Sequence, residues 1–163
     1  CGEDIHKRKV PCLHWAAERG YTELLKWLLQ IGNNIEGITE IHAGATPLVA
    51  AVLGGHVECV KVLIEAGSDV SVSLEGIPCL SLSLALAPFP KFRSAALSIL
   101  ALLLEAGAPP SSLDPVGCSP VHRAASLGLL QPLNALRLAD APMAGKDYAL
   151  NTPLHYAVCS HSE

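Results

Sequence analysis

The chain has 163 residues, of which half are hydrophobic and only 16% are charged, and its formal net charge is −4. This composition excludes an intrinsically disordered chain, and the lack of a basic excess argues against a nucleic-acid partner. The most apolar stretch, residues 77–104, is interrupted by Pro88, Pro90, Lys91 and Arg93. Because neither side of this interruption reaches the roughly 18 apolar residues that a membrane span needs, we expect no membrane insertion.

The beginning of the chain and its cysteines bear on where the protein works. Charged residues crowd the first positions, which do not resemble a secretory signal. Since the chain begins with Cys1 rather than Met, we expect it to be part of a longer protein. Its six cysteines include no Cys-x-x-Cys pair, and a chain with this much core does not need a disulfide framework. We therefore expect a reducing, intracellular location, cytoplasmic with the nucleus as the second option.

Residues 44–70 form the clearest structural unit in the sequence. Thr46 can cap a short apolar helix over 47–53, because its hydroxyl can accept a backbone N–H of the first turn. A second helix over 57–65 carries apolar residues at helical spacing, and Gly67 ends it where a left-handed residue is needed. One such helix pair is too small to bury its own apolar faces, so it needs neighbours.

Four other segments are copies of this unit. The positions that align with Thr46 are Pro11, Pro78, Ser119 and Thr152, and the successive spacings are 35, 32, 41 and 33 residues. Scatter around a period of roughly 33 residues indicates an array of stacked repeats.

The copies share a motif. It reads LHWAA in residues 13–17, TPLVAA in 46–51, SPVHRAA in 119–125 and TPLHYA in 152–157, and three of the second helices end in Gly. On these residues the chain resembles the ankyrin-repeat family over nearly its whole length. The resemblance implies an all-α solenoid of paired antiparallel helices with short β-hairpin-like fingers, in one domain over residues 1–163. About four repeats and a partial fifth follow from it: 7–38, 39–73, 74–112, 113–146 and 147–163.

In the first repeat we expect helices over 13–19 and 22–30. The basic run of residues 6–9 falls where a finger would lie, and it reads as a solvated arm or as a localisation patch, of which the arm is favoured. Trp15 is either a contact residue or a core filler between repeats 1 and 2. We favour the core, because Trp is buried on average.

The third repeat is irregular, because it contains an inserted loop at 88–95. Its first helix is expected over 80–87, and its second over 95–105 with Ser94 as the cap. The insertion should project at the edge away from the fingers. Its two phenylalanines either form a contact element or fold back onto the solenoid, and both alternatives stay open.

The last two repeats depart from the motif at their helix ends. Pro132 must lie in the first turn of a helix to be tolerated. Arg137 falls where the pattern has a buried Leu, and Asp140 replaces the terminal Gly, so we expect a shortened or shifted helix there. In the partial fifth repeat Leu150 replaces the turn Gly, and no second helix follows the first.

Seven histidines raise the question of chemistry. His14, His122 and His155 occupy the same repeat position, where a ring can bridge adjacent repeats, so we read them as structural. The cysteines at nearly equivalent positions are read as small core residues: Cys12, Cys79 and Cys118. The sequence contains no HExxH, no GxSxG and no P-loop. We therefore expect no enzyme activity, no cofactor and no metal site within this chain.

The resemblance places partner binding on the finger tips and on the exposed positions of the first helices, which together form a concave surface. The finger positions are Lys7, Arg8, His42, Ala43, Glu75, Pro115, Val116, Tyr148 and Asn151. The helix positions are Glu18, Arg19, Leu53, Gly54, Ser126, Leu127, Cys159 and Ser160. The inserted loop adds Phe89 and Phe92 as candidate contacts.

We therefore expect a non-catalytic scaffold or adaptor module that binds another protein or a peptide through its concave face. We expect it to be monomeric. The alternative is a regulatory or targeting domain of an enzyme, such as a kinase, lipase, acyltransferase or ubiquitin-ligase subunit, whose catalytic part lies outside this chain.

Overall fold

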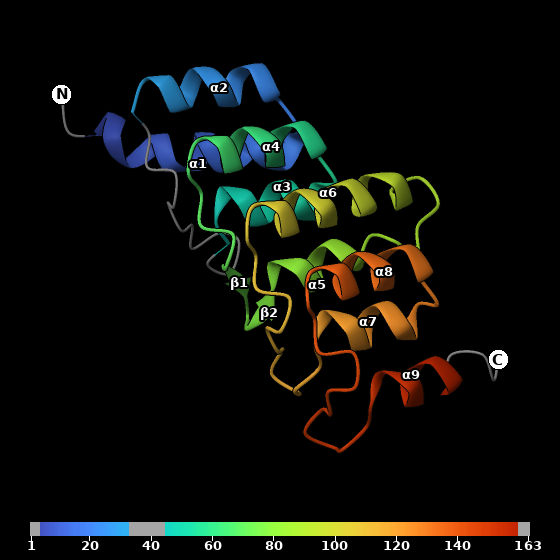
Figure 1. Cartoon of the computed structure of the whole chain (residues 1–163). Helices are drawn as coiled ribbons and strands as arrows, with labels where there is room; N and C mark the ends of the chain where they lie inside the picture. The colour runs from blue at the N-terminus through green and yellow to red at the C-terminus, as the bar shows by residue number, and fades with distance from the viewer. Residues whose placement is uncertain (1–3, 33–44, 160–163) are drawn as a thin grey trace.

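Stacked helix pairs build the structure. The computed structural model describes residues 4–32 and 45–159, with side chains described for 12–32 and 45–159. The inner layer consists of α1 (Asp4–Arg19), α3 (Pro47–Gly54), α5 (Cys79–Leu84), α7 (Pro120–Ser126) and α9 (Pro153–Cys159). The outer layer consists of α2 (Thr22–Gln30), α4 (Val57–Glu65), α6 (Arg93–Glu105) and α8 (Leu130–Leu138). Helices of one layer contact their neighbours in chain order, which confirms the predicted all-α ankyrin-repeat solenoid (Figure 1).

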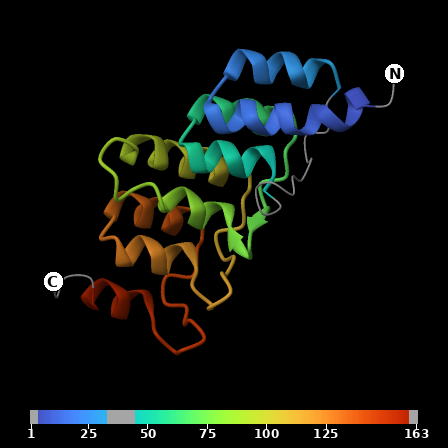
Figure 2. The same cartoon turned by 180° about the vertical axis from the view of Figure 1, so that it is seen from behind.

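Among the described residues, one short hairpin interrupts the helices. Strands β1 (Ser73–Leu74) and β2 (Ile77–Pro78) pair antiparallel, with Ser73 opposite Pro78 and Leu74 opposite Ile77. This hairpin projects from the same edge of the stack as the loops before α7 and α9 (Figure 2). Finger-like turns therefore line one edge of the inner layer, as the sequence predicts.

Local signals explain the reference unit. The Thr46 hydroxyl accepts a hydrogen bond from the Val49 backbone N–H over 3.3 Å, and Pro47 follows as the first helical residue. Helix α3 ends at Gly54, one residue later than expected, and α4 has the predicted bounds.

The second helices end in left-handed residues, as the sequence predicts. The glycines in this conformation are Gly32, Gly67 and Gly107, with φ of 80°, 94° and 87°. Asp140 takes the same conformation with φ of 57°, which Asp tolerates better than most side chains. Leu150 does so as well with φ of 66°, although a leucine has no such tolerance.

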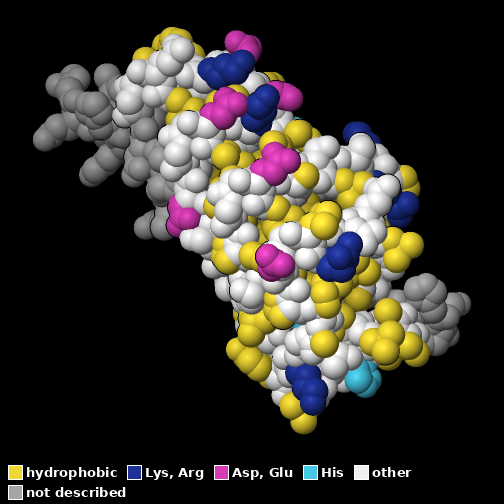
Figure 3. Space-filling view, in the orientation of Figure 1, with side chains coloured by type: hydrophobic (Ala, Val, Ile, Leu, Met, Phe, Trp, Pro, Cys, Tyr) yellow, Lys and Arg dark blue, Asp and Glu magenta, His cyan; other side chains and the backbone are white. Residues whose placement is uncertain are grey.

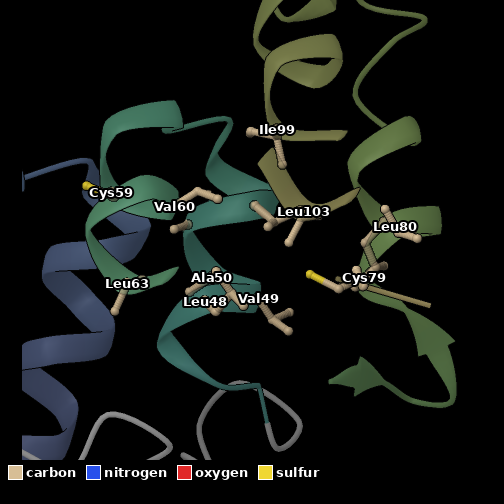
Figure 4. Close-up of a cluster of buried hydrophobic side chains, with 14 of the residues drawn as sticks. Leu48, Val49, Ala50, Cys59, Val60, Leu63, Cys79, Leu80, Ile99 and Leu103 are labelled. Carbon is tan, nitrogen blue, oxygen red and sulfur yellow. The ribbon is translucent and has the colours of Figure 1, made fainter. Parts of the chain in front are cut away.

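The core runs between the two layers and from repeat to repeat. Leu48 from α3, Val60 from α4 and Leu103 from α6 are fully buried, and they meet in one cluster with Cys79 of α5 (Figure 4). Each helix pair therefore buries its apolar face against the next pair rather than on its own. The alanines of the motif are buried as well, which lets the inner helices approach closely: Ala16, Ala17, Ala124 and Ala125.

The first repeat differs from the prediction at its start. Helix α1 begins at Asp4, so residues 6–9, with Lys7 and Arg8, lie in the helix and not in a finger. The physical reason is that this run has no Gly, Asn or Asp that would build a turn, whereas Lys and Arg favour helix. The expected helix over 13–19 is thus the second half of a longer one.

Two residues of the first repeat are more exposed than predicted. Cys12 lies at the surface, unlike its equivalents Cys79 and Cys118, which are buried. Trp15 is 46% exposed and is not a core filler. Side chains two positions apart on a helix point in nearly opposite directions, so Trp15 faces away from the core that buries Leu13.

The third repeat differs in both of its helices. Helix α5 ends at Leu84, three residues before the expected end, and a series of turns continues to Phe92. Helix α6 begins at Arg93, with Phe92 at the cap position and no side-chain capping bond, so Ser94 is not the cap. These turns take up the extra residues of the inserted loop before α6 starts.

The inserted loop lies at the edge away from the fingers, and its two phenylalanines behave differently. Phe89 is 59% exposed. Phe92 is half-buried, and its ring lies against repeat 2, so close that a Cβ on Gly55 would lie 3.0 Å from Phe92 Cδ1. The Arg93 Nε donates to the Ala87 oxygen over 3.3 Å and closes the loop.

The fourth repeat is more regular than predicted. Helix α8 has nine residues, the same length as α2 and α4, so it is neither shortened nor shifted. Leu136 is fully buried and Arg137 is exposed, because the helical register places the leucine and not the arginine against the core. Pro132 is the third helical residue and lies in the first turn, as expected.

His56 joins the first two repeats. Its Nε2 donates to the Glu18 backbone oxygen over 2.9 Å. The ring lies between Gly20 and Gly54, at each of which a Cβ would lie only 2.5 Å from a ring atom. This junction therefore depends on a glycine on either side of the imidazole.

Gly54→Ala tests this dependence. Alanine gains about 1 kcal/mol over glycine in helix propensity, but its Cβ would lie 2.5 Å from the His56 ring and 2.9 Å from the Glu18 oxygen. Because a backbone oxygen cannot move aside cheaply, we expect a net loss of about 1–2 kcal/mol in the free energy of unfolding, measured by urea denaturation.

Gly145→Ala is the matched control, since the atom nearest to its Cβ would be the Pro142 oxygen at 3.6 Å. We expect it to change stability by less than about 0.5 kcal/mol. An equal loss of unfolding free energy in both variants would contradict the close packing of the His56 ring between Gly20 and Gly54.

Candidate functional site

The inner helices and the fingers form one face of the molecule, which we call the inner face. Finger 3 is the hairpin of residues 73–78, finger 4 spans 114–118 and finger 5 spans 147–151. The opposite face, formed by the outer helices, carries scattered charges of both signs (Figure 3).

Fingers 4 and 5 have the same construction around a buried aspartate. Asp114 Oδ1 accepts from the backbone N–H of Val116 and of Cys118, over 3.0 and 2.8 Å. Asp147 Oδ1 accepts from the N–H groups two and four residues further on, over 2.9 and 2.8 Å. These carboxylates replace the backbone acceptors that an irregular turn lacks, and they hold both fingers in one conformation.

Fingers 4 and 5 also pack on each other. The Tyr148 N–H donates to the Val116 oxygen over 3.2 Å. Gly117, with φ of 83°, leaves room for this contact, because a Cβ there would lie 2.7 Å from the Tyr148 nitrogen and from its ring. The tips thus present two exposed side chains on a held backbone, with Val116 61% exposed and Tyr148 72% exposed.

His122 ties repeat 4 to finger 5. Its Nδ1 accepts from the Ser119 N–H over 3.1 Å and from the Ser119 hydroxyl over 2.9 Å. Its Nε2 donates to the Asn151 backbone oxygen over 3.2 Å. Both nitrogens are therefore used, and the bridging role predicted for this histidine is present. His155 repeats the first half of this pattern with Thr152.

Tyr156 closes the junction between repeats 4 and 5. Its hydroxyl donates to Asp147 Oδ2 over 2.7 Å. Because that hydroxyl has only one hydrogen, the Cys118 thiol, 3.1 Å from the same oxygen, acts as the donor to it. The hydrogen bond from Tyr156 lowers the pKa of Asp147, whereas its contacts with Cys118 and Asp147 raise the pKa of Tyr156. Burial raises the pKa of the Cys118 thiol.

Shallow hollows open between the described residues of the inner face, and two of them contain predicted contact residues. The C-terminal hollow, of about 290 Å³, is lined by finger 4, α7 and α9: Asp114, Val116, Cys118, His122, Arg123, Ser126 and Tyr156. The N-terminal hollow, of about 350 Å³, is lined by α1, α3 and finger 3: His14, Glu18, Ala45, Ala50, Leu53, Gly54 and Leu74. These volumes lie at the lower limit of small-molecule pockets, which are about 300–1,000 Å³.

The structure brings five of the predicted contact residues into these hollows. Glu18, Leu53 and Gly54 line the N-terminal hollow, and Val116 and Ser126 line the C-terminal hollow. Arg19, Glu75, Pro115 and Tyr148 are exposed near them on α1 and on the fingers. These predicted positions therefore share the inner face.

Other predicted residues lie elsewhere or serve the fold. Leu127 packs against the core, and Asn151 holds finger 5 through its backbone and its side-chain amide. Phe89 and Phe92 lie at the opposite edge, before α6. Cys159 is exposed at the end of α9. The side chains of Lys7 and Arg8, together with His42, Ala43 and Ser160, lie outside the described residues.

The sequence reasoning missed Arg123 and Tyr156, which line the C-terminal hollow. Both follow the motif histidine directly, as does Trp15 in repeat 1. The sequence did contain a signal for these residues, because the position after the motif histidine varies in size and charge between repeats while the neighbouring positions keep the motif. Trp15 packs on Tyr21 with ring centroids 5.1 Å apart and forms an exposed aromatic pair at α1.

The histidine–serine pair in repeat 4 does not form a catalytic dyad. Ser119 is buried, and its hydroxyl caps helix α7 through His122. Nucleophilic attack needs an accessible hydroxyl, which the buried Ser119 does not offer. Within the described residues no group of three or more potential metal ligands converges, and none of the described helices is long and apolar enough to cross a bilayer.

Comparisons with known proteins match the repeats seen here. A family model described as ankyrin repeats, in three copies, matches residues 1–73. The human protein "Ankyrin repeat domain-containing protein 29" is 39% identical over 69 residues, which is 40% of this chain and 23% of the relative. Its Danio rerio counterpart is 35% identical over 72 residues, 42% of this chain and 24% of the relative. The chain thus spans about a quarter of the length of these curated relatives.

Tyr156→Phe tests the hydrogen bond that closes finger 5. A carboxyl whose pKa is lower in the folded chain than its ordinary value of 3.8 stabilises the fold above that value. This contribution is lost as the pH falls through the lower, folded pKa of Asp147. We therefore expect the variant to lower the urea midpoint at neutral pH, and to lower it less in acid below the unfolded pKa.

Tyr148→Phe is the control, since that side chain is exposed at a finger tip. Its urea midpoint should follow that of the original chain at every pH. A loss from Tyr156→Phe that stays constant down to acid pH would contradict a charged Asp147 as the acceptor.

Alkylation by iodoacetamide tests the placement of the thiols. Burial raises the pKa of Cys79 from 9.0 to about 12, so its thiolate fraction at mildly alkaline pH falls about a thousandfold. We expect rapid modification of the exposed Cys12 and Cys159 and protection of Cys79, measured by peptide mass spectrometry. Labelling of Cys79 in the folded chain at the rate of Cys12 would contradict the stacking of α5.

Proposed function

Because this chain is an ankyrin-repeat protein, we propose that it is a non-catalytic interaction module that binds a protein or a peptide through its inner face. Ankyrin repeats generally bind proteins, and repeat arrays offer an extended surface instead of a deep pocket. The two hollows of the inner face agree with this role, because both are shallow and lie along the same extended surface. In this role the chain is a scaffold or adaptor.

One observation carries the proposal, namely the apolar side chains at the tips of fingers 4 and 5. Val116 and Tyr148 are mostly exposed, although their backbones are held by a direct hydrogen bond and by Gly117. Apolar surface that is exposed to water gains free energy when a partner covers it. Tyr is also enriched among the residues that dominate binding energies.

We further propose that the module is monomeric and works in the cytoplasm, with the nucleus as the second option. Support comes from the six cysteines, which form no Cys-x-x-Cys pair in the sequence. Cys79 is a buried core thiol, which suits a reducing compartment.

Alanine substitution on the inner face tests the proposal. The chain is used to capture partners from a cell extract, and the affinity of a captured protein is then measured for a double variant, Arg19→Ala with Tyr148→Ala. We expect a loss of about tenfold or more, since exposed Tyr and Arg side chains are frequent anchors. Leu130→Ala on α8 is the control, because Leu130 is 75% exposed on the outer layer.

A third variant separates the two candidate surfaces. Phe89→Ala removes the exposed ring of the inserted loop and leaves the inner face intact. If this variant abolished binding while the double variant bound normally, the partner site would be the inserted loop, and the proposal for the inner face would be wrong.

A further inference from the structure

Arg123 is the one charged side chain on the inner helices after repeat 1. Helices α3, α5, α7 and α9 are described in full, and among their residues only Arg123 carries a fixed charge. The charges of the outer helices are many and of both signs (Figure 3). A single cation on an otherwise uncharged floor is a local electrostatic feature of this face.

The fold does not need this cation. Arg123 lies 3.9 Å from Asp114, which is a long contact for an ion pair. Asp114 Oδ1 already accepts two backbone N–H groups. In finger 5 the equivalent Asp147 keeps the same turn with Tyr156, a neutral residue, at the position of Arg123. The comparison of the two fingers shows that the same turn forms around Oδ1 whether a guanidinium or a hydroxyl lies beside Oδ2.

A partner reaches the guanidinium before it reaches the carboxylate. The side chain of Arg123 is 37% exposed, whereas that of Asp114 is 7% exposed. A second carboxylate can therefore approach Arg123 from solvent, and a guanidinium can hold it through two parallel N–H bonds. Asp114 keeps its two amide donors when Arg123 turns away, so no buried carboxylate is left without a hydrogen bond.

The residues around Arg123 determine which side chain of a partner can bind next to its carboxylate. Val116, Cys118 and the Tyr156 ring form the apolar part of the C-terminal hollow, and its polar part is formed by Asp114, His122 and Ser126. The floor on the N-terminal side of α7 is made of uncharged residues of α3 and α5. An aliphatic or aromatic side chain next to the acidic one would therefore fill the hollow and exclude water from the ion pair.

We propose that the C-terminal hollow binds a peptide segment in which an Asp or Glu side chain pairs with Arg123 and an adjacent apolar side chain packs against Val116 and Tyr156. This inference rests on the proposed function, because it assumes that the inner face is the binding surface. It adds the chemistry of the partner, an acidic residue within an apolar segment.

A double-mutant cycle with a selected peptide tests the pairing. Phage-displayed random linear peptides are selected on the immobilised chain, and the consensus peptide is made with a fluorescein label. Affinities are measured by fluorescence anisotropy for the peptide and for its Glu→Gln or Asp→Asn form. The proteins are the original chain, Arg123→Gln, and the control Arg137→Gln, which removes an exposed arginine from α8.

We expect the selected peptides to contain an acidic residue beside an apolar one. Arg123→Gln and the neutral peptide should each weaken binding about tenfold, and the two changes together should be no worse than either alone. Arg137→Gln should bind normally, and Arg123→Lys, which keeps the charge but loses the planar fork, should lie in between. Urea unfolding of each variant checks that the fold is unchanged.

Different failures have different meanings. If the consensus peptide has no acidic residue, or if the two changes add in full, the pairing with Arg123 is wrong. If a peptide that does not pair with Arg123 still loses affinity for the Tyr148→Ala variant, the inner face is a binding surface and only the pairing with Arg123 is wrong. If the peptides lose affinity only with Arg137→Gln or Leu130→Ala on the outer layer, or if no peptide is selected, both proposals fail.

Discussion

Hydrogen bonds that cross from one repeat to the next set the register of the whole array. His56 donates back to Glu18 of repeat 1, and His122 donates forward to Asn151 of repeat 5. A helix pair of this size cannot bury its own apolar side chains, so it depends on a neighbouring pair in the correct register. The two imidazoles fix that register through hydrogen bonds to backbone atoms. Side chains such as Leu48 and Leu63 can then be fully buried between pairs.

Because the register is fixed by residues between the repeats, the residues exposed on the inner face can vary while the fold stays the same. The motif residue after the histidine is Trp15, Arg123 or Tyr156 in different repeats, and the helices around it keep the same packing. The fingers behave in the same way, since Asp114 and Asp147 build the same turn with different partners for their second oxygen. Changes of charge or size at these positions alter what the inner face can bind without altering how the repeats pack.

The sequence predicted those features that depend on a local signal. Thr46, Gly67 and Pro132 act within their own helix, and the structure places them as expected. Arg137 was misplaced because its burial depends on a register shift of one residue that the motif did not resolve. The role of Arg123 could not be predicted, because it depends on Asp114 in a separate turn and on the comparison with finger 5. Contacts between repeats, rather than propensities within them, decide these cases.

Phe92 has a consequence for how the array comes apart. In a linear array each interface contributes separately to stability, so unfolding can begin at either end and progress inwards. The Phe92 ring belongs to repeat 3 and lies against Gly55 of repeat 2, so it strengthens that one interface beyond the shared helix contacts. The steps of the array are therefore unequal, because separating repeat 3 from repeat 2 also requires the Phe92 ring to leave its place against Gly55.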